Sequence, residues 1–238
     1  MKKSIKILGV VVLVLVLVAV FLTSVLKKAG GSLDVVGKES VTTFETVLNS
    51  LPENVAADEK QGGWALTAPD GSVRFIWSKD FGKSPLYDVL LEFDAAPFVS
   101  AGLDPEKLPQ NYRVDGDNIV VGRKLGDAKS AATTTALAAY QEIVGKYRSA
   151  VGYHGQLDHY NIDLGGGNLF EWAKDFAKNG ATGENQDKDI VFVLNPDPFT
   201  AAGVDPANVE GWVYGEVVVD IDNKPTNVMK FLKPFNIK

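Results

Sequence analysis

The side chains best suited to chemistry lie in one short stretch that holds both histidines of the chain. His154 and His159 are separated by four residues, one of which is Asp158. Imidazole and carboxylate groups serve as metal ligands and as general acids or bases. The segment 153–164 is predicted to be a single strand, on which positions five apart point to opposite faces. We therefore expect the two imidazoles to face apart, and we predict no metal site and no cofactor.

Two other motifs resemble ligand-binding loops but lack essential parts. The run Asp115–Asn118 begins like a calcium loop, but the twelfth position, where an EF-hand loop has Glu, is Gly126 here. The glycines at 165–167 are not followed by the Lys and Ser or Thr of a phosphate loop. Both motifs are predicted to be hairpin turns, and no Gly-x-Ser-x-Gly nucleophile motif occurs in the sequence.

A pair of similar runs supplies four further candidate site residues. Trp-Ser-Lys-Asp-Phe and Trp-Ala-Lys-Asp-Phe place Lys79 and Asp80 in the same context as Lys174 and Asp175. Lys and Asp at strand ends are usually exposed and interact weakly. The functional alternative is a cleft between two structural units with these four residues at its mouth. We predict no catalytic residues.

A longer phrase also occurs twice, as Asp94–Pro105 and as Asn195–Pro206. Both copies keep Pro-Phe, Ala-Gly, an aliphatic residue and Asp-Pro, which indicates a tandem duplication. Asp before Pro is typical of a helix start, and Gly after the last residue is typical of a helix end. The phrase therefore predicts two short helical turns, with Phe98 and Phe199 as buried anchors.

The duplication predicts an α+β fold made of two tandem repeats after an N-terminal transmembrane helix. Residues 40–127 and 128–238 are expected to form one unit each, a helix packed on an antiparallel β-meander. Trp77 and Trp172 should be equivalent and buried. The order of elements is similar to that of helix-on-curved-sheet folds of the cystatin-like kind, a likeness that carries no function. Residues 29–39 are predicted to be a tether.

The first 28 residues are predicted to be a signal anchor. Residues 7–26 are almost wholly apolar, and twenty residues in a helix span about 30 Å, the thickness of the hydrocarbon core. Lys2, Lys3 and Lys6 precede this run and outnumber Lys27 and Lys28 after it, so the N-terminus should be cytoplasmic and the rest outside. The alternative is a secreted chain, cleaved after this segment.

The charge of the outer part argues against nucleic acid as a partner. Five of the 24 basic residues lie at or before Lys28 and all 30 acidic residues follow it, which leaves a net charge of −11. Together with the scarcity of catalytic residue types, these features favour a membrane-anchored, non-enzymatic module outside the cytoplasm. Its partner would be a protein, an envelope polymer or a small ligand. The alternatives are a carboxylate- or metal-dependent envelope hydrolase and a structural subunit of a surface assembly.

Overall fold

The computed structural model of the chain describes residues 35–84, 86–126, 132–176, 188–221 and 224–237. The predicted membrane segment and most of the predicted tether lie outside these residues, so both stay predictions. Within the described ranges, no helix combines the length and the apolar character needed to cross a bilayer. Residues 40–238 cluster into one compact unit by their contacts.

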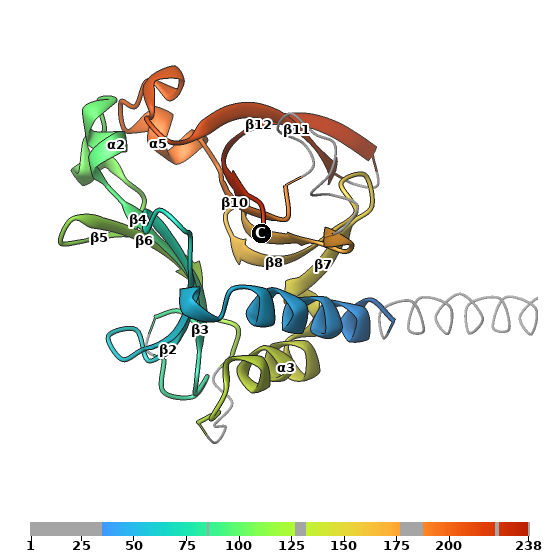
Figure 1. The fold of residues 1–238 in the computed structure, drawn as a ribbon. Coiled ribbons are helices and arrows are strands. Elements are labelled where there is room, and N and C mark those ends of the chain that lie inside the picture. The colour runs from blue at the N-terminus through green and yellow to red at the C-terminus, as the bar shows by residue number, and fades with distance from the viewer. Residues whose placement is uncertain (1–34, 85, 127–131, 177–187, 222–223, 238) are drawn as a thin grey trace, which may run out of the picture. The chain divides into compact units, whose positions relative to one another are not determined.

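The fold is α+β, as predicted, and contains two antiparallel sheets of six strands each (Figure 1). The first sheet has the order β1-β2-β3-β4-β6-β5. Its strands are β1 (Val55–Asp58), β2 (Gly63–Thr67), β3 (Val73–Ser78), β4 (Val89–Asp94), β5 (Tyr112–Asp115) and β6 (Asn118–Arg123).

The second sheet repeats this order further along the chain, as β7-β8-β9-β10-β12-β11. Neither sheet is a simple meander, because the fifth strand lies at the edge and the sixth returns between the fifth and the fourth. The strands of the second sheet are β7 (Val151–His154), β8 (His159–Gly165), β9 (Asn168–Ala173), β10 (Ile190–Leu194), β11 (Val213–Ile221) and β12 (Lys224–Phe235).

Short helical turns interrupt each half at corresponding places. The repeated phrase forms α2 and η2 in the first half and α5 and η4 in the second. The Asp-Pro pairs predict caps at Asp104, Asp197 and Asp205. Asp104 and Asp205 accept hydrogen bonds from Glu106 N and Ala207 N, each at 3.2 Å, so these two caps are confirmed. The turns are η1 (Pro52–Asn54), α2 (Ala96–Ser100), η2 (Pro105–Lys107), η3 (Arg148–Ala150), α5 (Asp197–Ala201) and η4 (Pro206–Asn208).

Both longer helices differ in extent from the sequence prediction. The first helix covers residues 35–50 and so includes the last part of the predicted tether. A single Gly37 does not end it, because an interior glycine costs only about 1 kcal/mol. The Ala-rich sequence predicts a second helix over 128–150. Helix α3 (Ala136–Lys146) begins later, since Thr135 is extended and its Oγ1 accepts a bond from Ala138 N at 3.1 Å.

Each of these helices contacts the sheet of the other half. Helix α3 packs on β1, β2 and β3 of the first sheet. Trp77 on β3 donates its Nε1 hydrogen bond to Ala136 O at 2.9 Å. Trp172 on β9 donates the equivalent bond to Thr43 Oγ1 in the first helix, also at 2.9 Å. Helix α3 thus packs on the sheet of the other half, and the first helix contacts both sheets, with the Phe44 ring 5.4 Å from Trp77 and 5.1 Å from Trp172. The duplication alone predicts each helix on its own sheet.

The repeated phrases pack against each other. Asp104 N donates to Ala202 O at 2.9 Å, and Asp205 N donates to Ala101 O at 2.8 Å. The rings of Phe98 and Phe199 lie 4.8 Å apart, and those of Phe75 and Phe170 stack at 4.3 Å. Equivalent positions therefore meet at the centre of residues 40–238. The prediction that Trp77, Trp172, Phe98 and Phe199 are buried is confirmed, because each is 0% exposed.

Candidate ligand cavity

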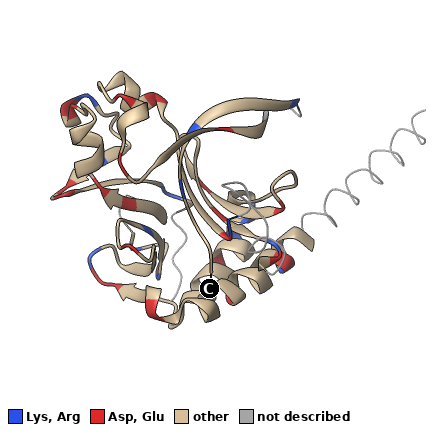
Figure 2. Cartoon of the chain, turned by 45° about the horizontal axis from the view of Figure 1, so that its top comes forward, with Lys and Arg blue, Asp and Glu red and all other residues tan. Residues whose placement is uncertain are grey.

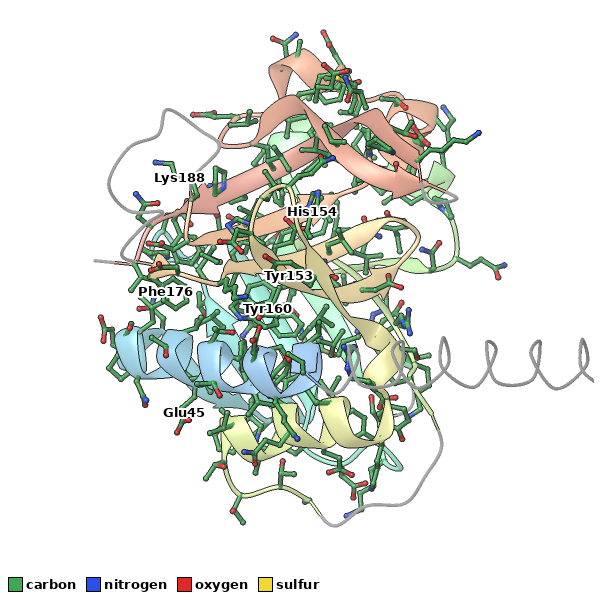
Figure 3. The ribbon with its side chains drawn as sticks, turned by 90° about the vertical axis from the view of Figure 1, so that its right-hand side faces the viewer. Glu45, Tyr153, His154, Tyr160, Phe176 and Lys188 are labelled. Carbon is green, nitrogen blue, oxygen red and sulfur yellow. The ribbon has the colours of Figure 1, made fainter. Side chains whose placement is uncertain are left out.

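The two histidines lie on the same face of the second sheet, so the prediction that they face apart is wrong. The segment 153–164 contains the end of β7, a turn and most of β8 rather than one strand. His154 on β7 and His159 on β8 are directly paired across the hairpin. Cross-strand partners share a face. Tyr153 and Tyr160 are the next pair and lie together on the other face, while His154 lies nearer to the β11–β12 hairpin (Figure 3).

The imidazoles flank the carboxylate of Glu171 on the neighbouring strand β9. His154 Nδ1 lies 3.7 Å from Glu171 Oε1, and His159 Nδ1 lies 3.9 Å from Oε2. At these distances the contacts are electrostatic rather than good hydrogen bonds. The Glu171 side chain is only 4% exposed. Burial alone would raise the pKa of this carboxyl, but the two imidazoles hold the pKa below its ordinary value, so the group is ionised at neutral pH.

This group lies at a cavity of about 380 Å³ on the bent second sheet (Figure 1). The volume falls within the range of small-molecule sites, which are mostly apolar with a few polar groups. All six strands of the second sheet and the β7–β8 turn contribute. The lining residues are His154, Gln156, Leu157, His159, Leu169, Glu171, Val191, Val193, Val213, Gly215, Glu216, Val217, Val218, Val219, Lys230, Leu232 and Pro234.

The alternation of side chains along the strands explains why this face is apolar. Val191 and Val193 on β10 pair with Pro234 and Leu232 on β12, and Val193 also pairs with Leu169 on β9. Residues between them, such as Phe192, point to the opposite face and enter the aromatic core. One face of the second sheet therefore builds the core, and the other builds the cavity.

His159 is the most unusual group in the cavity wall. Its side chain is 0% exposed, and neither Nδ1 nor Nε2 has a hydrogen-bond partner among the described residues. An unpaired buried polar group costs about 1–3 kcal/mol, so such groups usually have a reason to be kept. A polar group of a bound molecule would satisfy this imidazole.

A single lysine marks another part of the cavity wall. Lys230 on β12 lines the cavity, and its Nζ donates a hydrogen bond to Gly167 O at 2.9 Å. Burial lowers the pKa of this ammonium group. The glycines 165–167 thus form the predicted hairpin turn, between β8 and β9, and they supply a carbonyl to this lysine.

The equivalent face of the first sheet is built differently. The shift of 95 residues that relates the two halves places Ile76 where Glu171 lies, and Trp64 where His159 lies. Ile76 packs with Ala65, Leu90 and Val120 in a buried cluster. The charged Arg74 and Glu92 form an ion pair on the adjacent strands β3 and β4, where the second sheet has the apolar Leu169 and Val193. Within the described residues, the first sheet thus has the buried carboxylate of Glu92 paired with Arg74 where the second sheet has the apolar wall beside Glu171.

The four candidate cleft residues do not line this cavity. Lys79 pairs with Glu59 at 2.8 Å and lies over the ring of Trp64 at 5.2 Å. Lys174 lies over the ring of Tyr153 at 5.4 Å. Asp80 accepts a bond from Gly82 N at 3.1 Å, and Asp175 lies just beyond the end of β9 at Ala173, after Lys174. Both lysines therefore cover an aromatic ring of their own half.

Acidic residues occur on turns and strands throughout the described chain, rather than in one patch (Figure 2). Asp115 lies at the tight β5–β6 turn, as predicted, and pairs with Lys60 at 2.9 Å. Within the described ranges, no group of three His, Asp or Glu residues is arranged to hold a metal ion. Comparisons of the chain with protein-family models, curated proteins and solved structures find no match.

Proposed function

We propose that the chain is a membrane-anchored, extracytoplasmic and non-enzymatic module that binds a small apolar ligand in the cavity of its second sheet. The observation that carries this proposal is the cavity itself. It combines a largely aliphatic wall with a buried imidazole whose two nitrogens have no hydrogen-bond partner among the described residues. Apolar walls with a few oriented polar groups are typical of ligand sites.

The charge state of Glu171 supports binding over hydrolysis. A carboxyl that acts as a general acid needs a raised pKa, usually from burial or a second carboxyl. The pKa of Glu171 is lowered instead, and the other carboxyl in the wall, Glu216, is exposed. The carboxyls with raised pKa, Asp88 and Asp189, lie outside the cavity and accept backbone hydrogen bonds from Leu125 and Ile237. These two carboxylates therefore fix neighbouring segments of the backbone, which is a structural role.

The location proposed for this module rests on the N-terminal sequence. Residues 7–26 are long and apolar enough to stay as an anchor, and the lysines before them exceed those after them. We expect the mature protein to keep these residues. N-terminal sequencing of the membrane-extracted protein tests this expectation, and a mature chain that begins near Val25 or Ala29 would contradict it.

Ligand binding can be tested with a fluorophore at the cavity rim. The chain has no Cys, so Val213→Cys provides one attachment point for an environment-sensitive label. Val213 lines the cavity and is 42% exposed. Addition of an aliphatic alcohol of about ten carbons should shift the emission in a saturable way, because the ligand replaces water beside the label.

Val114→Cys is the matched control for this titration. Val114 is 45% exposed but lies on β5 in the first sheet. The label there should respond only weakly and without saturation. Equal responses at the two positions would mean that the alcohol acts on the surface in general, which would contradict a site in the cavity.

A further inference from the structure

The cavity wall favours a flexible aliphatic chain over a ring. Among the described lining residues none is Phe, Tyr or Trp, the only rings are the imidazoles of His154 and His159, and the apolar side chains are Val, Leu and Pro. The aromatic side chains of the second sheet, such as Phe170, Trp172 and Phe192, lie on the opposite face in the core. Sugars and nucleobases are commonly held by stacking on aromatic rings. A wall of branched aliphatic groups offers dispersion contacts without such a platform.

The buried carboxylate of Glu171 limits the charge that the polar end of the ligand, its head group, can carry. Glu171 is an ionised, nearly fully buried carboxylate between two imidazoles. A carboxylate head would bring a second negative charge close to it, and an ammonium head would compete with the imidazoles for it. Either change places an extra charge where water is scarce, which is costly. An uncharged head that both donates and accepts a hydrogen bond avoids this cost.

His159 offers what such a head needs. An imidazole nitrogen can donate or accept a hydrogen bond, and neither nitrogen of His159 has a hydrogen-bond partner in the described chain, although Nδ1 faces Glu171 Oε2 at 3.9 Å. A hydroxyl or an amide can satisfy one of them and still donate toward a carboxylate. We propose that the ligand is a single aliphatic chain with an uncharged hydroxyl or amide head, which is bound by His159 beside Glu171. This inference rests on the ligand-binding function proposed above.

The test compares three probes that differ only in the head. The full chain labelled through Val213→Cys is titrated with an alcohol, a carboxylate and an ammonium compound, each with about ten carbons. We expect the alcohol to bind most tightly. In the same background, His159→Phe should weaken alcohol binding about tenfold, the loss of roughly one hydrogen bond. His159→Gln keeps a donor and an acceptor and should retain most of the affinity.

The possible results distinguish a failure of the proposed head group from a failure of ligand binding itself. Equal affinity for the three probes would contradict an uncharged head group but leave ligand binding intact. The same conclusion would follow if His159→Phe did not weaken binding of the alcohol. The comparison of heads uses the native cavity, so it decides the question even if His159→Phe does not fold. If none of the three probes shifts the label, the binding function itself is wrong.

Discussion

Phe199→Ala is expected to lower the free energy of unfolding by about 3–5 kcal/mol. Phe199 is 0% exposed and lies at the centre of the aromatic core. Its ring centroid is 4.8 Å from that of Phe98, 5.3 Å from Tyr112 and 5.9 Å from Phe231. Removing the ring loses its transfer free energy and leaves a cavity between the two halves. Denaturant unfolding followed by tryptophan fluorescence measures the change.

The neighbouring helix α2 supplies a control for this substitution. Val99 follows the equivalent phenylalanine, Phe98, and is 49% exposed. Val99→Ala should therefore change the free energy of unfolding by less than about 0.5 kcal/mol. A loss below about 1 kcal/mol for Phe199→Ala would show that the ring does not anchor the core.

Gly203→Ala should destabilise the protein by at least about 1–3 kcal/mol, the cost of a strained backbone position. Gly203 has a φ of +102°, and a Cβ there would lie 2.9 Å from Gly102 O. Gly102 has a φ of +104° and meets Gly203 O in the same way, at 2.7 Å. Any side chain would push apart the two phrases, which are joined here by reciprocal backbone hydrogen bonds.

Gly116→Ala separates the steric part of this effect from the strain. Gly116 lies in the β5–β6 turn with a φ of +65°, and a Cβ there would meet nothing within 4 Å. Gly116→Ala introduces only the strain of a left-handed backbone, so it should lower the free energy of unfolding by less than Gly203→Ala does. If the two substitutions cost the same, the contact between the phrases does not contribute.

The repeated phrase shows how far local sequence reasoning reaches. Its Asp-Pro pairs predict caps, and the caps at Asp104 and Asp205 are present. The cap predicted at Asp197 is wrong, because α5 has Pro196 at that position, and Asn195 accepts the bond from Asp197 N at 3.3 Å. The packing of one phrase on the other could not be predicted, since it joins positions about a hundred residues apart that share no local signal.

The histidines illustrate a mistake in assigning strands. The β-rich run over 153–164 predicts a single strand, which would place the two imidazoles on opposite faces. The sequence does contain an indication of two strands, which is the polar turn between the two histidines. Gly155 and Gln156 are both exposed, and Asp158 takes a positive φ of 54°, which Asp tolerates better than most residues. A turn at this place brings both imidazoles to one face.

The cavity could be predicted only in part. The alternation of Val217 and Val219 against Val218 predicts a strand, and β11 is one, but the structure places all three valines in the wall, so the alternation does not separate the two faces. The uniformly apolar β10 gives no such signal, because both of its faces are buried. Glu171 within an otherwise apolar stretch of β9 was the remaining clue. Its neighbours depend on the pairing of strands, which composition does not fix.

The most direct test of ligand binding fills the cavity and leaves the rim unchanged. Val193 is 3% exposed and lies on the cavity side of β10, so Val193→Trp would occupy the space of the ligand's chain. Combined with the label at Val213→Cys, this substitution should abolish the saturable emission shift caused by the aliphatic alcohol, while an unfolding measurement shows that the chain still folds. A saturable shift of unchanged size and midpoint in the folded Val193→Trp chain would contradict a ligand site in the cavity.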